Sequence, residues 1–342
     1  MFVIELLSSV MGTTSKLDLI RSIIPSSDPG SHKGQRGRIG IVGGSIEYTG
    51  APYFSAAAAM KTGADLAYLI CPHEAAPVIK CYDPDLIVHP LLNIEHETRQ
   101  VSATVLDKIN SIVQTWHSVV IGPGLGRVDE SKLLLDSIIS IAKERNIPMV
   151  IDADGLWFVT KDLDMVRGYS KAILTPNVME FDRMYKAAFD KEPDTKGGSG
   201  ENVCELSKIL GVVVIRKGQV DIISDGTQTI ECDREGSARR CGGQGDLLSG
   251  ALGTFSYWAM KSRSPDTEDT QTASVTNKCF DKLSPLMVAS FAACNLTREC
   301  NRVAFHTHRN GAILADSITT KDMIDVIHVA KAKLLQYSSS TV

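Results

Sequence analysis

The chain has 342 residues, 43% of them hydrophobic, which is enough apolar material for one large core. Its 36 basic and 40 acidic residues nearly balance, and this argues against a nucleic-acid-binding protein, because such proteins carry a basic excess. No apolar run approaches the roughly 18–20 residues that cross a bilayer, so the sequence also argues against a membrane-spanning protein.

After a helical segment near the N-terminus, strand and helix patterns alternate along the chain. Six short apolar runs that end near glycine, proline or aspartate are typical of buried parallel strands. They are Arg38–Val42, Leu66–Cys71, Ser118–Ile121, Met149–Asp152, Ala172–Leu174 and Val212–Lys217. The helical patterns between them are Tyr53–Thr62, Val101–Thr115, Glu130–Arg145, Met179–Ala188 and Glu201–Leu210. This alternation predicts an α/β fold with a doubly wound, mostly parallel central sheet, helices on both faces and no separate lid domain.

The second half of the chain departs from this alternation. Two strand-like runs within Val220–Cys232 flank Asp225-Gly226, which is a hairpin signal. A helical pattern begins at Gly243 and is interrupted by the polar stretch Ser262–Lys282, which we interpret as a surface loop. We expect an N-terminal extension and helix over residues 1–30, one catalytic domain over 31–335 and a tail over 336–342.

Cysteine usage and the N-terminal sequence bear on the compartment. The eight cysteines are scattered without a C-x-x-C pair, so neither a disulfide framework nor a zinc site is expected. The first eleven residues lack the basic region of a secretory signal. We therefore expect a cytoplasmic protein, with a mitochondrial form as the alternative.

A glycine-rich turn, Gly242–Asp246, leads directly into a helical pattern. Its three glycines let a ligand approach the backbone, and the free N–H groups at a helix N-terminus are a natural seat for phosphate. Asp246 has two interpretations. It is either a favourable charge at a helix start or a base that takes a proton from a hydroxyl group attacking phosphorus, and we favour the base.

Two common nucleotide-binding motifs do not fit the chain. No Walker sequence G-x-x-x-x-G-K-[ST] occurs. The glycine cluster Gly122–Arg127 follows a predicted strand, but its third glycine comes one position too early for the Rossmann pattern. A different phosphate-binding family is therefore indicated.

Five motifs occur in order along more than half of the chain. They are His32–Ala56, Gly122–Arg127, Ile151–Gly155, Thr175–Phe181 and Gly242–Gly250. Together they resemble the ATP-dependent NAD(P)H-hydrate dehydratases of the ribokinase-like superfamily. The resemblance implies a repair reaction, in which ATP phosphorylates the hydroxyl of a hydrated nicotinamide ring and loss of phosphate restores NADH or NADPH. It also implies a functional partnership with an NAD(P)H-hydrate epimerase.

The resemblance assigns roles to specific positions. Asp246 would be the base that contacts the substrate hydroxyl. Hydrated NADH or NADPH would be bound by Tyr48, Thr49, Gly50, Ala51, Gly126, Asn177, Val178, Met179, Glu180, Phe181, Asp182, Arg183 and Asp246. ATP would be bound by Lys217, Gly218, Gln219, Val220, Asp221, Arg239, Arg240, Cys241, Gly242, Gly243, Gln244 and Gly245.

Several assignments have a structural alternative. Gly126 would otherwise form a tight turn, Lys217–Asp221 an ordinary strand connection, and Arg239 and Arg240 solvated surface charges. His306 and His308 lie two apart in a helical pattern and point to different faces, so we expect no metal there. The family's glycine-arginine-serine turn is replaced by Arg309-Asn310-Gly311-Ala312, which puts any contact from that turn in doubt.

Magnesium is the cofactor that the resemblance implies. Glu180 would hold Mg²⁺ through water, because this ion usually keeps several waters. Alternatively, Asn177 and Glu180 form a capping box at a helix start. Asp152 and Asp154 either order magnesium-bound water or cap the helix near Gly155, and the sequence leaves both alternatives open.

Two rival functions remain at this point. A vitamin-type kinase of the same fold would phosphorylate a hydroxyethylthiazole, hydroxymethylpyrimidine or pyridoxal alcohol and release a stable ester. A non-catalytic nucleotide-binding relative would have lost the chemistry, but the intact Gly242–Asp246 motif argues against it. The sequence leaves open whether the protein forms a homo-oligomer.

Overall fold

The computed structural model describes residues 13–26, 30, 32–92, 102–128, 131–194, 199–263, 283–310 and 317–336. Within these residues one nine-stranded sheet has the order β3-β2-β1-β4-β5-β6-β7-β8-β9. The strands are β1 (Arg38–Val42), β2 (Leu66–Cys71), β3 (Ile87–Pro90), β4 (Ser118–Ile121), β5 (Met149–Ile151), β6 (Ala172–Leu174), β7 (Val213–Arg216), β8 (Asp221–Ser224) and β9 (Thr229–Cys232). Pairing is parallel from β3 through β7 and antiparallel at β8 and β9. The predicted doubly wound, mostly parallel sheet is confirmed.

All six predicted parallel strands are present, two of them slightly shorter than expected. The predicted hairpin is also present, and Asp225 Oδ1 shapes its turn by accepting hydrogen bonds from the backbone N–H groups of Thr227 and Gln228. The sequence analysis missed β3. The interruption at His89 and Pro90 hides its apolar pattern, which an edge strand tolerates because only one side of it is paired.

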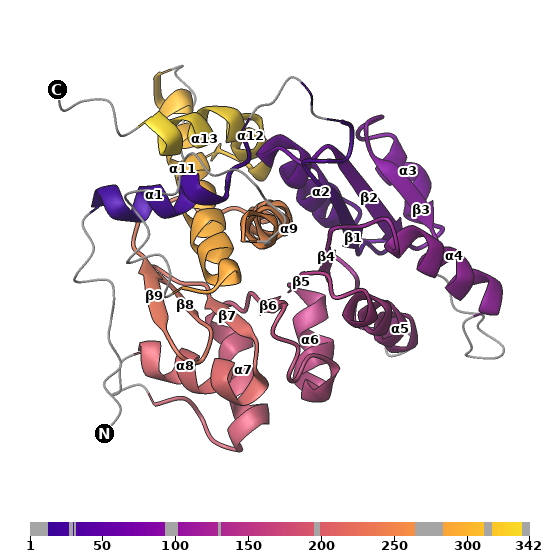
Figure 1. The fold of residues 1–342 in the computed structure, drawn as a ribbon. Helices are drawn as coiled ribbons and strands as arrows, with labels where there is room; N and C mark the ends of the chain where they lie inside the picture. Colours follow the sequence, from indigo (N-terminus) through magenta and orange to yellow (C-terminus); the bar gives the residue numbers. More distant parts are fainter. Residues whose placement is uncertain are drawn as a thin grey trace.

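Helices cover both faces of the sheet (Figure 1). On one face lie α1 (Thr13–Ile23), α2 (Gly50–Thr62), α9 (Gln244–Ser262), α11 (Pro285–Asn310), α12 (Thr320–Asp325) and α13 (Ile327–Gln336). On the other lie α4 (Ala103–Val113), α5 (Ser131–Glu144), α6 (Asp154–Lys161), α7 (Val178–Phe189) and α8 (Ser199–Leu210). The short helix α3 (Ala76–Lys80) precedes β3. Most of the predicted loop Ser262–Lys282 falls outside the described residues, as do Gly311 and Ala312.

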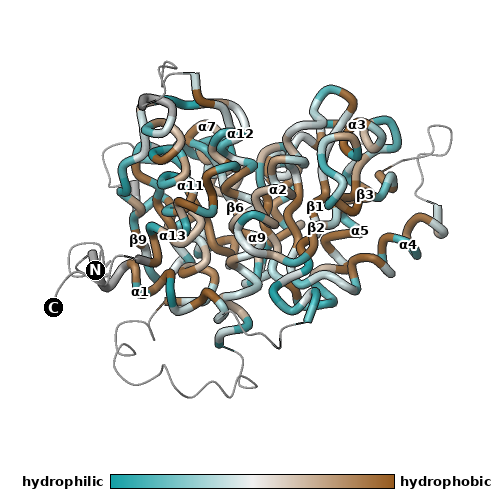
Figure 2. Tube along the Cα trace, turned by 90° about the horizontal axis from the view of Figure 1, so that it is seen from above, coloured by the Kyte–Doolittle hydropathy of each residue, from teal (hydrophilic) through white to brown (hydrophobic). Residues whose placement is uncertain are grey.

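Alternate residues of the strands pack into two hydrophobic cores, one on each face of the sheet. In β4, Val120 packs into the core that includes α2, α9 and α11, whereas Val119 and Ile121 pack into the core that includes α5 and α6. In Figure 2 the strands are mostly brown and the outer turns teal, as this arrangement requires. Helix α1 adds Leu17 and Ile20 to the first core, so this N-terminal helix packs against the body of the fold.

Strand order reverses between β1 and β4, and ligands of doubly wound sheets bind at such a reversal, beyond the carboxyl ends of the strands. Gly122 follows β4 there with φ of 120°, and a Cβ on it would lie 1.9 Å from the carbonyl oxygen of Asp152. Nearby, a Cβ on Gly250 of α9 would lie 2.0 Å from the carbonyl oxygen of Ser55 in α2. Only glycine permits these two approaches, which bring the β4 turn, β5, α2 and α9 together.

Candidate active site

A buried ion pair lies at the carboxyl ends of the central strands. Lys217, directly after β7, donates from Nζ to Oδ1 of Asp152, directly after β5, over 2.8 Å. Thr175, directly after β6, donates to the same oxygen over 2.7 Å. Asp152 is only 2% exposed, so three successive strands fix one carboxylate and one ammonium group at this edge.

Asp246 lies beside this pair, in the first turn of α9. Its side chain is buried, and burial raises its pKa well above the usual aspartate value. The charge of Asp152 raises that pKa further, whereas Lys217 lowers it. An elevated pKa suits a carboxylate that must accept a proton near neutral pH.

The start of α9 leaves backbone donors open for an anion. Gly243 precedes the helix with φ of 93°, and the first intrahelical bond runs from Leu247 N–H to its carbonyl over 3.1 Å. The N–H groups of Gln244, Gly245 and Asp246 therefore have no acceptor within the helix. The N-cap residue is Gly243, and Asp246 adds a negative charge in the first turn of the helix, so the helix-start charge and the role as a base are both compatible with its position.

The glycine-rich turn at the start of α9 lies next to the ion pair of Lys217 and Asp152. A Cβ on Gly245 would be 3.5 Å from Lys217 Nζ and 3.6 Å from Asp152 Oδ2. Burial tends to lower the pKa of Lys217, but Asp152, Glu180 and Asp246 outweigh burial and raise it, so the lysine stays charged. A cation and free amide donors thus converge on the same space, an arrangement that stabilises transferring phosphate.

Asp154 holds the glycine cluster after β4. Its Oδ2 accepts from the Gly126 N–H and its Oδ1 from Arg127 Nε, both over 2.9 Å. Between Asp152 and Asp154, Ala153 takes a positive φ of 48°, a backbone strain of the kind that functional sites retain. Ala153 is the N-cap residue of α6, and Asp154 stands in its first turn, while the side-chain contacts of both aspartates described above go to other segments.

The capping box at α7 is confirmed. Asn177 Oδ1 accepts from the Glu180 N–H over 2.9 Å, and Glu180 Oε2 accepts from the Asn177 N–H over 2.8 Å. Val178 and Met179 are exposed beside them, and Arg183 is exposed one turn later. The Phe181 side chain is buried in the core beneath α7, so a contact from this residue to a substrate would have to come from its backbone.

The predicted substrate loop, Tyr48–Ala51, contacts the same glycine cluster. A Cβ on Gly124 would lie 2.7 Å from the Tyr48 carbonyl oxygen and 3.1 Å from Ala51 Cβ. Tyr48 is 60% exposed, which leaves its ring available to a ligand. Thr49 Oγ1 shares a 2.7 Å hydrogen bond with the hydroxyl of Tyr82, a residue that the sequence analysis did not single out.

The two predicted ATP segments differ in how their side chains are used. In Lys217–Asp221, both carboxylate oxygens of Asp221 are engaged, one by the Gly218 N–H and one by Arg298 Nε. The Asp221 side chain therefore shapes the turn, and the assignment of this segment to ATP stays a prediction. Gly218 and Val220 are half-buried and Gln219 is exposed.

In Arg239–Gly245 the Gln244 side chain turns back into its own loop, where it donates to the Arg239 carbonyl and to Cys241 Sγ. Thr320 donates to the Gly242 carbonyl over 2.6 Å and secures the loop from α12. Arg240 is exposed. The loop therefore offers its main-chain amides and the exposed Arg240 side chain to a phosphate group, but not the Gln244 side chain.

Comparisons with known proteins show the family of the chain. A family model described as NAD(P)H-hydrate dehydratase matches residues 39–320. The chain belongs to this family. The human ATP-dependent (S)-NAD(P)H-hydrate dehydratase is 45% identical over 329 residues, covering 96% of this chain and 87% of the human protein. The predicted family resemblance is confirmed.

Solved structures show the same fold as this dehydratase-family chain. A ribokinase-like superfamily protein from Enterococcus faecalis V583 has a TM-score of 0.68 at 18% identity, covering 92% of this chain and 94% of its own. The ADP/ATP-dependent NAD(P)H-hydrate dehydratase from Bacillus subtilis, co-crystallised with ATP/Mg²⁺, has a TM-score of 0.65 at 17% identity, covering 98% and 100%. The ribokinase-like fold is therefore confirmed.

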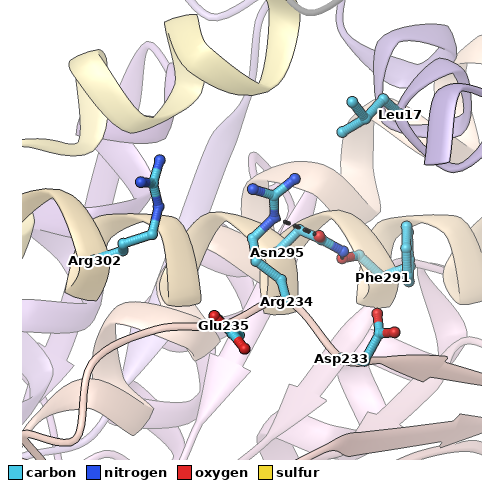
Figure 3. Close-up of a pocket in the computed structure, with 7 residues that line it drawn as sticks. All are labelled: Leu17, Asp233, Arg234, Glu235, Phe291, Asn295 and Arg302. Atoms are coloured by element: carbon cyan, nitrogen blue, oxygen red, sulfur yellow. Dashed lines mark hydrogen bonds between the residues drawn. The ribbon is translucent and has the colours of Figure 1, made fainter.

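Other features of this dehydratase-family chain lie apart from the site. A cavity of about 290 Å³ opens between α1, α11 and the segment after β9, and none of the predicted site residues lines it (Figure 3). Among the described residues, no three His, Cys, Asp or Glu side chains could hold a metal together. Within the same part of the chain, no helix is both long and apolar enough to span a membrane.

Proposed function

We propose that this chain is an ATP-dependent (S)-NAD(P)H-hydrate dehydratase. The observation that carries the proposal is the position of Asp246, a buried carboxylate of raised pKa beside the open amides of α9 and the Lys217–Asp152 pair. The names and 45% identity of the relatives support the same activity. Tyr48–Ala51, Gly126 and the exposed start of α7 would hold the hydrated nucleotide, and Lys217–Val220 with Arg239–Gly245 would hold ATP.

In the first step, Asp246 takes the proton from the ring hydroxyl of the substrate. The hydroxyl oxygen then bonds to the γ-phosphorus of ATP as the bond from that phosphorus to ADP breaks. The amides of Gln244 and Gly245 donate to the phosphoryl oxygens, and Lys217 offsets their charge. Thr175 and Asp152 keep the Lys217 ammonium in place throughout.

In the second step, the carbon–oxygen bond of the phosphoester breaks. Phosphate leaves with the bonding electrons, the ring nitrogen lone pair replaces them, and the neighbouring ring carbon releases a proton to restore the double bond. The products are reduced nucleotide, ADP and phosphate. A kinase-type site thus supplies a dehydration, because phosphate is a far better leaving group than hydroxide.

The residues present fit a magnesium ion that arrives with ATP. The capping bond engages Glu180 Oε2 and leaves Oε1 to order a metal-bound water, while Glu180 lies close enough to Lys217 to raise its pKa. The lack of three convergent protein ligands among the described residues fits an ion held mostly by phosphate and water. When bound, Mg²⁺ would neutralise part of the phosphate charge.

The decisive assay uses purified protein, ATP, Mg²⁺ and each epimer of hydrated NADH and NADPH. We expect the absorbance of the reduced ring to return with the S epimer and one ADP to form per ring restored. The rival vitamin kinase predicts ATP consumption with hydroxyethylthiazole, hydroxymethylpyrimidine or pyridoxal alcohols and none with the hydrate. That result would overturn the proposal.

The proposal extends to the cellular setting. An epimerase that interconverts the two hydrates would supply the S epimer, so adding one should let the protein consume an R,S mixture completely. A cytoplasmic location, with a mitochondrial form as the alternative, is part of the proposal. Subcellular fractionation of the native protein tests it.

A further inference from the structure

Helix α11 directs three polar side chains towards the loops that flank the proposed ATP site. Asn295, Arg298 and Asn301 are spaced three residues apart and therefore lie along one side of the helix. Each forms a hydrogen bond to the segment between β9 and α9. The sequence motifs of the chain do not include these residues.

Arg298 connects one proposed ATP segment, Lys217–Asp221, to the chain that leads into the other, Arg239–Gly245. Its Nε donates to Asp221 Oδ2 over 2.7 Å and its Nη2 to the Gly218 carbonyl over 3.0 Å, both in the turn after β7. Its Nη1 donates to the Arg234 carbonyl over 3.2 Å, in the segment after β9. The side chain is only 16% exposed. Its three nitrogens each have a protein acceptor, so Arg298 is not placed to bind phosphate itself.

Asn301 continues the same connection towards the catalytic helix. Its Oδ1 accepts from the Ser237 N–H and its Nδ2 donates to the Arg239 carbonyl over 3.1 Å. The Arg239 carbonyl also accepts from Gln244, the first residue of α9. Hydrogen bonds thus run from the turn after β7, through α11, to the helix that carries Asp246.

We propose that Arg298 is a positioning residue that sets the spacing between the two ATP-binding segments and thereby the affinity for ATP. A nucleotide that lies between two loops binds best when their separation is fixed in advance, since binding then needs no reordering. The inference rests on the proposed ATP site. It predicts an effect on ATP with little effect on the hydrated nucleotide, because Arg298 contacts none of the residues proposed to hold that nucleotide.

The test compares Arg298→Lys with wild type and with Arg302→Lys. Lysine can keep the ion pair with Asp221 but cannot reach both carbonyls, because it lacks the planar fork of arginine. Arg302, one turn further along α11, pairs with Glu299 of the same helix and is the matched control. We expect Arg298→Lys to raise the KM for ATP by roughly tenfold, the effect of losing about two hydrogen bonds. The KM for the hydrate and the Arg302→Lys values should stay near wild type.

Direct binding of a fluorescent ATP analogue separates this inference from the proposed function. If wild type binds the analogue but does not dehydrate the substrate, weaker binding by Arg298→Lys still supports the positioning role. Equal analogue affinity in the two proteins, a parallel rise in both KM values, or no analogue binding by wild type overturns it. If Arg298→Lys does not fold, Asn301→Ala decides, since an unchanged ATP affinity in that variant also overturns the role.

Discussion

Lys217 Nζ and Asp152 Oδ1 lie 2.8 Å apart, although 65 residues separate them in the sequence. The pair connects the carboxyl ends of β7 and β5, and Asp152 also raises the pKa of Asp246. Binding of phosphate by Lys217 and proton transfer to Asp246 therefore depend on the same buried carboxylate.

Replacing Asp152 by asparagine should shift the pH profile of the reaction. The raising effect of Asp152 on Asp246 disappears while the lowering effect of Lys217 remains, so the Asp246 pKa falls. Because the base must be deprotonated, the acidic limb of kcat/KM against pH should move to lower pH. An unchanged acidic limb would show that Asp152 does not influence the pKa of Asp246.

The same variant should lose stability, because a charge-assisted hydrogen bond contributes about 1.5–3 kcal/mol. The matched control is Asp136→Asn, which breaks the more exposed pair with Lys132 on α5 and should cost less than about 1 kcal/mol. Chemical denaturation of the three proteins gives both values.

Replacing Asp246 by asparagine should separate catalysis from binding and stability. Turnover should fall by roughly 10² or more, as for the loss of a general base, whereas the affinity for ATP survives. Since the folded-state pKa of Asp246 is raised, the wild type is penalised as pH rises from the unfolded-state value through the folded one. The variant should therefore melt at a higher temperature than wild type at about pH 8, with the difference shrinking towards about pH 4. A variant with full turnover would contradict the mechanism.

Replacing Gly122 by alanine should unfold or severely weaken the protein. The new Cβ meets the Asp152 carbonyl, and the clash of about 1–3 kcal/mol adds to about 1–2 kcal/mol of left-handed backbone strain. Gly168→Ala is the matched control, because Gly168 has φ of 74° and open space around its Cβ position. In a thermal melt, Gly168→Ala should lose only the stability that the backbone strain costs. An equal loss of stability in Gly122→Ala and Gly168→Ala would show that no clash contributes.

The two functions of the α7 N-terminus can be separated by substitution. Asn177→Ala removes a cap and should cost about 1 kcal/mol of stability. Glu180→Gln keeps an oxygen for the capping bond but removes the charge, so its melting temperature should stay near wild type while its activity needs more Mg²⁺. Measuring the activity of Glu180→Gln as a function of Mg²⁺ concentration checks this. If the dependence on Mg²⁺ is the same as for wild type, Glu180 only caps the helix.

The parts of the fold that could be predicted from sequence depend on local signals. Apolar runs such as Ser118–Ile121 and the hairpin at Asp225-Gly226 specify their structure within a few residues. The Gly242–Asp246 motif likewise shows its chemistry locally. The role of Asp152 could not be predicted, because its partners Thr175 and Lys217 come from other strands.

Residues that hold other segments in place were the hardest to predict from the sequence. Arg298 lies within a long helix, where an arginine ordinarily serves as a solvated surface charge, and its acceptors are 64 to 80 residues away. Phe181 and Asp221 were assigned to ligands because they belong to functional motifs. In the structure their side chains are buried and contact other parts of the protein, which the motifs alone did not indicate.

The approach of Gly250 to Ser55 also fixes how closely two helices of the site can pack. No side chain separates their backbones at that point, so α2, which carries Ala51, lies directly against α9, which carries Asp246. The geometry between the incoming alcohol and its proton acceptor is therefore preorganised before either ligand arrives.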